Sequence, residues 1–213
     1  MVELTFNIEA ECTRMPYTKE VLDKCDAFSC GNEDLDSFFQ HDIFLYEEEM
    51  LGKSYCWVTN NRPHKIMALM TLSNDSIKSS LLPTNSRNRF NRVFNNEKRN
   101  LTYPATLIGR LGVNTQYQGK RIGRQVMDFI KQRSIVSYNS NGCRFLVVDA
   151  YNNPCTLHYY ENNGFNYMHK DEQVERDSLK RYDSNGNLIF QLENSDELKT
   201  RMMYFDLKKI SKY

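Results

Sequence analysis

The sequence lacks several features that would each indicate a particular class of protein. No apolar run approaches the roughly 18–20 residues that a membrane-spanning helix requires, so we predict no membrane protein. The 28 lysines and arginines nearly balance the 27 aspartates and glutamates, and the formal net charge is +1. No overall basic field therefore indicates nucleic acid, and any such partner would bind a local patch. No internal repeat or flexible linker divides the chain, so we predict one domain over residues 1–213.

The cysteines are too thinly spread to indicate a disulfide framework or a metal site. They are Cys12, Cys25, Cys30, Cys56, Cys143 and Cys155. Cys25 and Cys30 could bind a metal together with His41, but no second closely spaced pair follows to complete a tetrahedral site. The segment Met1–Ala10 carries glutamates in an alternating pattern, unlike a secretory h-region. We therefore predict reduced thiols, no metal and a cytoplasmic location.

Hydrophobic periodicity predicts strands and helices that alternate along the chain, as in an α+β domain around a mixed sheet. The expected strands are 4–10, Ser54–Thr59, Ile66–Ser73, Leu107–Asn114, Phe145–Ala150, Gly164–Tyr167, Leu188–Leu192 and Arg201–Leu207. One amphipathic helix is expected from the cap Asn32 to near Gly52. A second follows the strand that ends at Asn114, and a third lies between Asn153 and Gly164. Residues 83–104 lack periodicity and are predicted to form a loop or a short irregular helix.

The turn after the predicted strand Leu107–Asn114 is the most informative feature of the sequence. A helix is expected to open at Gly119–Gly123, and a helix N-terminus binds phosphate through its amides and its dipole. Lys120, Arg121 and Arg124 add positive charge beside it. An ordinary strand–turn–helix with a solvated basic first turn explains the same residues, and no Walker lysine pattern is present. Spacing alone leaves both interpretations open.

The residues around this turn resemble the coenzyme A motif of the GNAT superfamily of acetyltransferases, Gln/Arg-x-x-Gly-x-Gly/Ala after a strand. Gln118 and Gly123 match its first and last positions, whereas Arg121 stands where the central glycine is usual. Downstream, the strand Val147–Ala150 is followed by the stretch Tyr159–Phe165, which is similar to the Phe-Tyr-Glu-x-x-Gly-Phe pattern of the family.

Further segments are similar to one branch of the superfamily, the bacterial toxin-type GNAT acetyltransferases. They are Phe28–Gly31, Leu35–Phe38, Thr71–Ser73 and Ile108–Leu111. The resemblance covers roughly residues 28–165 and 201–207. The stretch from Tyr167 to Thr200 is longer than expected for that branch.

The resemblance implies the GNAT fold, a central mixed sheet flanked by α-helices and splayed at two parallel strands, with acetyl-coenzyme A (acetyl-CoA) in the split. Here the two strands would be Leu107–Asn114 and Phe145–Ala150. The implied cofactor-binding residues are Leu111, Gly112, Val113, Gln118, Gly119, Lys120, Arg121, Ile122, Gly123, Arg124 and Asn153. Tyr160 takes the family position of the acid that protonates the departing thiolate. The alternative is that Tyr160 is a core aromatic, since the chain has 13 tyrosines. No general base is assigned.

The acceptor amine is less clear from the sequence. Residues 83–104 contain basic side chains with aromatic side chains between them: Arg87, Arg89, Arg92, Lys98, Arg99, Phe90 and Phe94. Such a pattern suits a single-stranded nucleic acid, but composition favours a solvated loop anchored to the core by its phenylalanines. The toxin-type resemblance implies aminoacyl-tRNA as acceptor and a small antitoxin as partner, and a homodimer is conceivable. The alternatives are a small-molecule amine or protein N-terminus as acceptor, or a non-catalytic coenzyme A-binding module.

Overall fold

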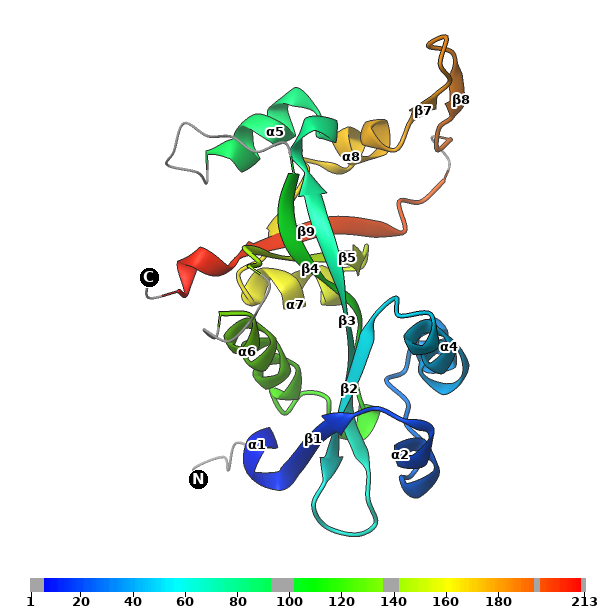
Figure 1. Cartoon of the computed structure of the whole chain (residues 1–213), viewed down its shortest axis with the longest axis vertical. Coiled ribbons are helices and arrows are strands. Elements are labelled where there is room, and N and C mark those ends of the chain that lie inside the picture. The colour runs from blue at the N-terminus through cyan, green and yellow to red at the C-terminus, as the bar shows by residue number, and fades with distance from the viewer. Residues whose placement is uncertain (1–5, 93–101, 136–141, 194–195, 212–213) are drawn as a thin grey trace. The chain divides into compact units, whose positions relative to one another are not determined.

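The structure, a computed structural model, describes residues 6–92, 102–135, 142–193 and 196–211 (Figure 1). Contacts divide the chain into two compact units. The first unit comprises Met1–Asn74 and Leu107–Ser140, and the second comprises Asp75–Thr106 and Asn141–Tyr213. Strands β3 (Ile66–Lys78) and β4 (Thr102–Val113) each belong partly to one unit and partly to the other.

The described strands form a mixed sheet flanked by helices. Its order is β1-β2-β3-β4-β5-β9-β6, and β7 and β8 form a separate two-stranded sheet. The pairs β1–β2, β2–β3, β5–β9 and β9–β6 are antiparallel, whereas β4 and β5 are parallel neighbours. The predicted α+β class with a central mixed sheet is therefore confirmed.

In the first unit, an antiparallel meander buries one face beneath the helices that follow β1. The elements are β1 (Cys12–Pro16), α2 (Lys19–Lys24), α3 (Glu33–Ser37), a π-helical turn η1 (Phe38–Asp42), α4 (Ile43–Glu48), β2 (Lys53–Thr59) and β3. As predicted, Asn32 caps α3, because its side chain accepts a hydrogen bond from the Leu35 amide at 3.0 Å. Phe39 and Ile43 pack with Cys56 and Leu69 in one buried cluster. The expected helix thus exists, but it contains a π-helical turn.

The opposite face of this meander packs against α6 (Ile122–Ile135). Because side chains alternate along a strand, Trp57 points away from the side that Cys56 occupies. Its ring meets that of Phe129 on α6 edge-on, with centroids 5.4 Å apart. Figure 1 shows α6 on one side of β2 and β3 and α4 on the other. This packing fixes the helix whose N-terminus the sequence assigns to phosphate binding.

The N-terminal strand expected at residues 4–10 is wrong where the structure describes it. Ile8–Glu11 forms a short helix, α1, and the first strand begins only at Cys12. The Asn7 side chain accepts hydrogen bonds from the amides of Glu9 and Ala10, so a local cap overrides the period-2 pattern. Residues 1–5 lie outside the described part of the chain.

In the second unit, helices cover both faces of the strand pair β5 (Phe145–Tyr151) and β9 (Thr200–Asp206). Helix α5 (Thr84–Asn91) supplies Phe90, whose ring lies 5.1 Å from Phe145 and 5.3 Å from Tyr204. The neighbouring β9 residue Phe205 packs instead against Phe165, which follows α7 (Pro154–Asn162) and precedes β6 (Asn166–Tyr167). The near-continuous apolar run of β5 therefore suits a strand buried on both faces.

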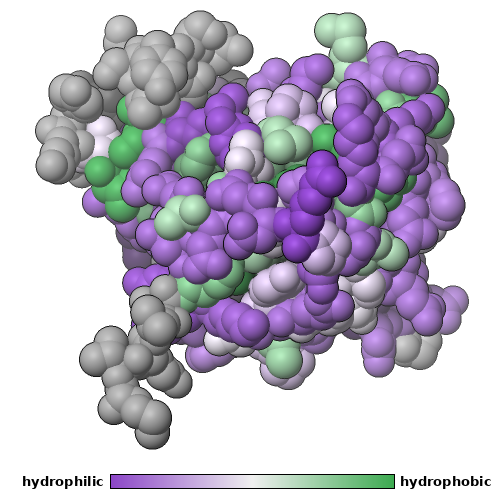
Figure 2. Space-filling model, turned by 90° about the horizontal axis from the view of Figure 1, so that it is seen from below, coloured by the Kyte–Doolittle hydropathy of each residue, from purple (hydrophilic) through white to green (hydrophobic). Residues whose placement is uncertain are grey.

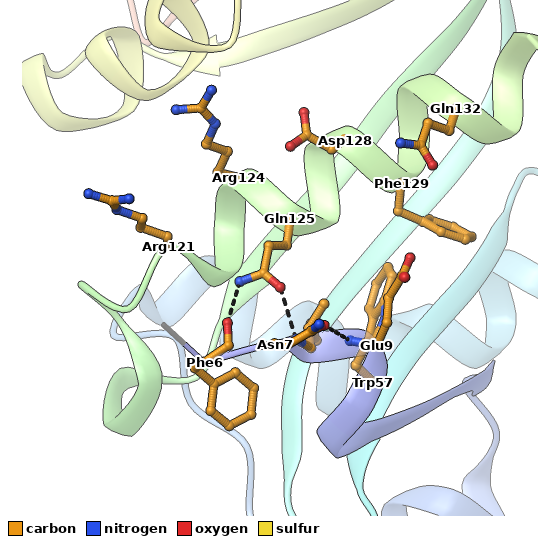
Figure 3. Close-up of a pocket in the computed structure, with 11 residues that line it drawn as sticks. Phe6, Asn7, Glu9, Trp57, Arg121, Arg124, Gln125, Asp128, Phe129 and Gln132 are labelled. Atoms are coloured by element: carbon orange, nitrogen blue, oxygen red, sulfur yellow. Dashed lines mark hydrogen bonds between the residues drawn. The ribbon is translucent and has the colours of Figure 1, made fainter. Parts of the chain in front are cut away.

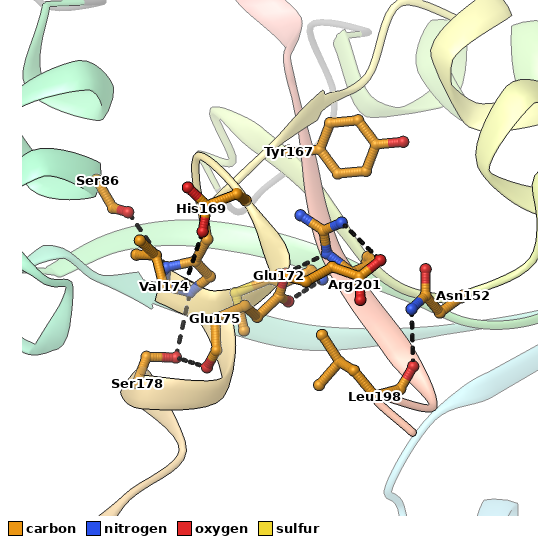
Figure 4. Close-up of polar contacts among 12 residues, drawn as sticks. Ser86, Asn152, Tyr167, His169, Glu172, Val174, Glu175, Ser178, Leu198 and Arg201 are labelled. Carbon is orange, nitrogen blue, oxygen red and sulfur yellow. Dashed lines mark hydrogen bonds and ion pairs between the residues drawn. The ribbon is translucent and has the colours of Figure 1, made fainter. Parts of the chain in front are cut away.

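Helix α8 (Glu172–Ser178) is attached to β9 by buried polar groups (Figure 4). The Glu175 carboxylate accepts hydrogen bonds from Arg201 Nε at 2.6 Å and from the Met202 amide at 2.5 Å. His169 lies 3.2 Å from the hydroxyl of Ser86 on α5. Burial, together with the charges of Arg201 and Arg89, lowers the pKa of His169. Beyond α8, a turn at Asp183–Gly186 connects β7 (Arg181–Tyr182) to β8 (Leu188–Phe190).

The hydropathy of the surface is that expected from the composition of the chain. Hydrophilic residues dominate the face shown in Figure 2, with hydrophobic residues interspersed among them. None of the helices in the described ranges combines the length and the apolar character needed to cross a membrane.

Candidate active site

The turn after β4 is built on a buried asparagine. Asn114 follows the last strand residue, and its side-chain amide donates to the Ile66 carbonyl at 3.0 Å. Its side-chain oxygen accepts from the Gln116 amide at 3.0 Å, which starts the 3₁₀ turn Thr115–Tyr117. Helix α6 then begins at Ile122. The strand, turn and helix predicted from the sequence are thus present in this order.

Two residues of the turn adopt the left-handed backbone conformation. Gly119 has φ +77°, and Arg121 has φ +60°. Left-handed backbone suits glycine and is costly for residues that carry a Cβ. Arg121 occupies the position where the GNAT pattern has its central glycine, so the backbone at this position has the conformation that glycine would take. The departure from the pattern lies in the side chain and not in the path of the chain.

Replacing Arg121 by glycine is expected to stabilise the protein slightly. Removing the Cβ relieves about 1–2 kcal/mol of left-handed strain, and the greater freedom of glycine in the unfolded state takes back about 0.5–1 kcal/mol. Lys120→Gly is the control, since φ is positive at Arg121 but not at Lys120. It should lose stability. Urea denaturation of both variants measures the difference, and an Arg121→Gly protein that is less stable than Lys120→Gly would contradict the strain argument.

The turn is held by a loop from before α3. The Gln118 side-chain amide donates to the Cys30 carbonyl at 2.8 Å and to the Val113 carbonyl at 3.0 Å. The Thr115 amide donates to the Ser29 carbonyl at 2.9 Å. Because the Gln118 side chain bonds protein carbonyls, this residue would act on a phosphate through its backbone. Sequence reasoning placed Gln118 in the site but missed this supporting loop.

The same loop packs against β4 at Gly112. A Cβ on Gly112 would lie 3.1 Å from both Cys30 Cβ and Phe39 Cε2, so a side chain at this position would require these neighbours to shift. The carboxylate of Asp36 fixes the loop, since it accepts from the Ser29 hydroxyl at 2.6 Å and from the Cys30 amide at 2.8 Å. These contacts give a structural reason for the segments Phe28–Gly31 and Leu35–Phe38, whose role the sequence alone did not reveal.

Positive charge gathers at the start of α6. Lys120, Arg121 and Arg124 are exposed, and in the described ranges no carboxylate forms an ion pair with them. Figure 3 shows Arg121 and Arg124 projecting from this end of the helix, on the side away from Trp57. Arg121, Arg124 and Gln125 line a cleft of about 480 Å³, and the Gln125 side chain ties α6 to the Phe6 carbonyl at 2.8 Å. The turn therefore combines backbone amides with cations that have no acid partner there.

The other predicted site residues lie in the second unit, on or next to α7. Asn153 caps this helix by accepting from the Thr156 amide at 2.9 Å. Tyr160 is 5% exposed, and its ring packs edge-on against Tyr159 and Phe165. Burial raises the pKa of the Tyr160 phenol. The phenol is therefore protonated at neutral pH, as a proton donor must be, and burial at the same time makes it a weaker acid.

Three other titratable side chains are candidates for a general base: His158, Asp149 and Glu161, of which Glu161 is exposed on α7. His158 is exposed on α7. Asp149 is the one exposed residue within the buried run of β5. Desolvation, followed by the charges of Asp75 and Glu175, raises the pKa of Asp149. The raised pKa suits a base better than an ordinary aspartate, but none of the contacts described for Asp149 places it beside a reacting group. The base stays unassigned.

Comparisons with known proteins address the family. Residues 90–167 match the family model described as an acetyltransferase (GNAT) domain. None of the curated proteins matches the sequence.

Solved structures resemble the chain over nearly its whole length. A tyrosine-to-phenylalanine mutant of KacT has a TM-score of 0.63 and 16% identity, covering 94% of this chain and 97% of its own. AtaT in complex with acetyl-methionyl-tRNAfMet has a TM-score of 0.59 and 18% identity, with coverages of 94% and 97%. A tyrosine-to-phenylalanine mutant of the AtaT toxin, bound to the C-terminus of the antitoxin AtaR and acetyl-CoA, has a TM-score of 0.53 and 17% identity, with coverages of 94% and 96%. At these identities the likeness concerns the fold.

The family model supports the predicted GNAT acetyltransferase family, whose members use acetyl-CoA, and the solved structures show that the fold is shared. Residues 90–167 therefore match a GNAT acetyltransferase domain.

Proposed function

We propose that this protein transfers the acetyl group of acetyl-CoA to the α-amino group of aminoacyl-tRNA. The binding of acetyl-CoA in this proposal rests on the turn between β4 and α6. Its left-handed residues Gly119 and Arg121 direct the chain into a helix N-terminus, and three cations without acid partners among the described residues stand beside it. Such a turn fits the pyrophosphate of coenzyme A.

In the proposed reaction, the protein acts by positioning the reactants and by stabilising charge. The backbone of Leu111 and Val113 would hold the pantetheine arm, and an amide there would donate a hydrogen bond to the thioester oxygen, where negative charge develops. The amine attacks the carbonyl carbon directly, so no covalent enzyme intermediate is needed and orientation supplies much of the rate. Tyr160 donates its phenolic proton to the departing thiolate sulfur and regains a proton from solvent. An α-amino group needs little help to lose its proton near neutral pH, because its ordinary pKa is about 8.

The choice of acceptor is supported by the fold likeness to AtaT, which was solved with acetyl-methionyl-tRNAfMet. Phe90 does not support this choice of acceptor, because its ring is not available to stack on a base. Phe90 is 1% exposed and packs in the core of the second unit, as the anchored-loop interpretation expects. Phe94, Lys98 and Arg99 lie outside the described residues. An antitoxin partner is proposed on the likeness to AtaT bound to AtaR, and a homodimer stays a prediction.

The test is an acetyl-transfer assay with a panel of acceptors. Purified protein is incubated with acetyl-CoA and either charged tRNA, uncharged tRNA, spermidine or a short peptide with a free N-terminus, and products are identified by mass spectrometry. We expect acetylation of charged tRNA alone. Turnover of spermidine or peptide without turnover of charged tRNA would show that the acceptor is a small-molecule amine or a protein N-terminus and not aminoacyl-tRNA. Binding of acetyl-CoA without turnover of any acceptor would indicate a coenzyme A-binding module.

A further inference from the structure

Arg110 on β4 has an unusual environment for a partly buried arginine. Its guanidinium carbon lies 4.7 Å from the centre of the Phe38 ring. That ring is itself held edge-on by Phe39 and Tyr46, with centroids 5.8 Å away in both cases. Phe38 is also the first residue of the π-helical turn η1, and π-helical turns are frequent at functional sites. Phe38, supported by these two rings, therefore holds the Arg110 guanidinium in place.

The hydrogen-bonding groups of Arg110 are mostly unused within the described part of the chain. Nη1 donates to the Gly109 carbonyl at 2.9 Å. Nε is buried without a hydrogen-bond partner, and no described carboxylate forms an ion pair with this guanidinium. A buried donor left without an acceptor is costly and calls for an explanation such as a bound ligand.

Two other arginines with little exposure are paired with acids, whereas the half-buried Arg89 and Arg176 donate to backbone carbonyls. Arg201 bonds Glu175 at 2.6 Å, and Arg144 bonds Asp206 at 2.9 Å. The fold thus supplies each of these four arginines with a carboxylate or with backbone carbonyls from other segments of the chain. Arg110 is instead supported by an aromatic ring, an arrangement that orients a guanidinium and leaves its planar fork for an anion.

Arg110 also lies next to the backbone that is proposed to hold the thioester. Residues two apart on a strand share a face, so Arg110 is on the side of β4 where Gly112 contacts Cys30 and Phe39. Leu111, between Arg110 and Gly112, belongs to the backbone assigned to the pantetheine arm. A group bound by Arg110 would therefore be close to the reacting carbonyl, on the face covered by η1.

We propose that Arg110 binds an oxyanion, a phosphate or a carboxylate, that the acceptor carries near its amine. This inference rests on the proposed function and narrows its substrate class. Amines with a neighbouring anionic group would be acetylated, whereas purely cationic amines such as spermidine would be poor acceptors because Arg110 repels them. Arg110 acts by binding and orienting the acceptor and takes no part in proton transfer.

Kinetics of Arg110→Met and Arg110→Lys test the inference. Losing a charge-assisted hydrogen bond should raise the KM for charged tRNA about 10- to 100-fold in Arg110→Met, while the KM for acetyl-CoA stays unchanged. Lysine retains the charge but not the fork, so Arg110→Lys should lie in between. Arg133→Met is the matched control, because Arg133 also stacks on an aromatic ring, that of Tyr55, at 5.2 Å. Its KM for charged tRNA should equal that of the wild type.

Two further acceptors identify the source of the oxyanion. If Arg110 binds a carboxylate, leucine should be a better acceptor than leucine amide, and this preference should vanish in Arg110→Met. If it binds a phosphate, only charged tRNA should be affected. An unchanged KM for every acceptor in Arg110→Met would overturn the inference. So would a raised KM for acetyl-CoA, which would assign the arginine to the cofactor.

A binding measurement separates this inference from the proposed function. Calorimetry in the presence of coenzyme A gives the dissociation constants of uncharged tRNA and of N-acetylleucine, which require no turnover. Equal constants for wild type and Arg110→Met would overturn the role of Arg110 even if charged tRNA is acetylated. A constant raised about tenfold or more for either ligand would support it even if charged tRNA is not acetylated. Circular dichroism checks that each variant is folded. If Arg110→Met does not fold, Arg110→Lys replaces it in these binding measurements.

Discussion

Replacing Tyr160 by phenylalanine is expected to lower turnover about 10²–10⁴-fold, the range typical of a lost general acid. The affinity for acetyl-CoA should not change. Phenylalanine fills the same space, so the edge-on packing against Tyr159 and Phe165 is kept and only the hydroxyl is removed. Steady-state kinetics with the acceptor that the transfer assay identifies, together with calorimetric titration of coenzyme A, measure the two quantities separately.

The pH dependence offers a second test of the same role. Burial raises the pKa of Tyr160 above its ordinary value of about 10. The phenol is therefore protonated throughout the neutral and mildly alkaline range, and loss of its proton should not reduce turnover below about pH 10. An alkaline decline with an apparent pKa well below this value, present in the wild type and absent from Tyr160→Phe, would contradict the assignment.

Tyr159→Phe is the matched control for this substitution. Tyr159 precedes Tyr160 on α7 and packs against it with ring centroids 5.0 Å apart, so the two variants remove the same atom from neighbouring positions. Turnover of Tyr159→Phe should stay close to that of the wild type. If both variants lose activity equally, the tyrosines serve the packing of α7, which is the core-aromatic interpretation of the sequence.

The largest expected effect on stability comes from Glu175→Ala. Glu175 and Arg201 are 5% and 7% exposed, and alanine would leave the guanidinium buried without its main acid partner. Breaking a buried pair in this way typically costs about 3–5 kcal/mol. The Met202 amide would lose its acceptor as well. Denaturation in urea should show this loss in the free energy of unfolding.

Glu172→Ala and a double substitution complete this test. Glu172 is 3.7 Å from Arg201, and its side chain is 50% exposed, so its removal should cost less than about 1 kcal/mol. Burial raises the pKa of Glu175 despite its bonds to Arg201 and Met202, which indicates that desolvation largely offsets the attraction. Replacing both partners, Glu175→Leu with Arg201→Met, should therefore recover much of the loss. Equal costs for Glu175→Ala and Glu172→Ala would show that the pair does not anchor α8.

The elements that sequence patterns identified best are those with long, one-sided or fully apolar runs. The buried run Phe145–Ala150 and the amphipathic α6 depend on the hydrophobic effect, which a local pattern records directly. Sequence patterns determine less about short segments. The strand expected over α1 was wrong, because the cap formed by Asn7 outweighed a weak alternation. For residues 83–104 the pattern left a loop or a short irregular helix open, and the structure has the eight-residue helix α5, which the tertiary packing of Phe90 supports.

The candidate site likewise has some features that the sequence located and others that only the folded structure shows. The family pattern located the turn and marked Arg121 as a departure, but only the backbone dihedral shows that Arg121 keeps the conformation of the missing glycine. Likewise, Gln118 is predicted to belong to the cofactor site, and only the structure shows that its side chain bonds the carbonyls of Cys30 and Val113 and leaves its backbone for that role. Cys30 is 88 residues away in the chain, and single-sequence patterns carry no information about contacts at such separations.

By itself, the sequence determined the α+β class, the order of most strands and helices, and the position of the turn, because burial and capping leave local patterns. The tertiary structure decided three matters. It placed Phe90 in the core, it surrounded Tyr160 with rings that keep its phenol protonated, and it left Arg110 on an aromatic ring without a described acid partner. Each depends on which distant side chains meet, and therefore on the solvent and charge that a group experiences once the chain has folded.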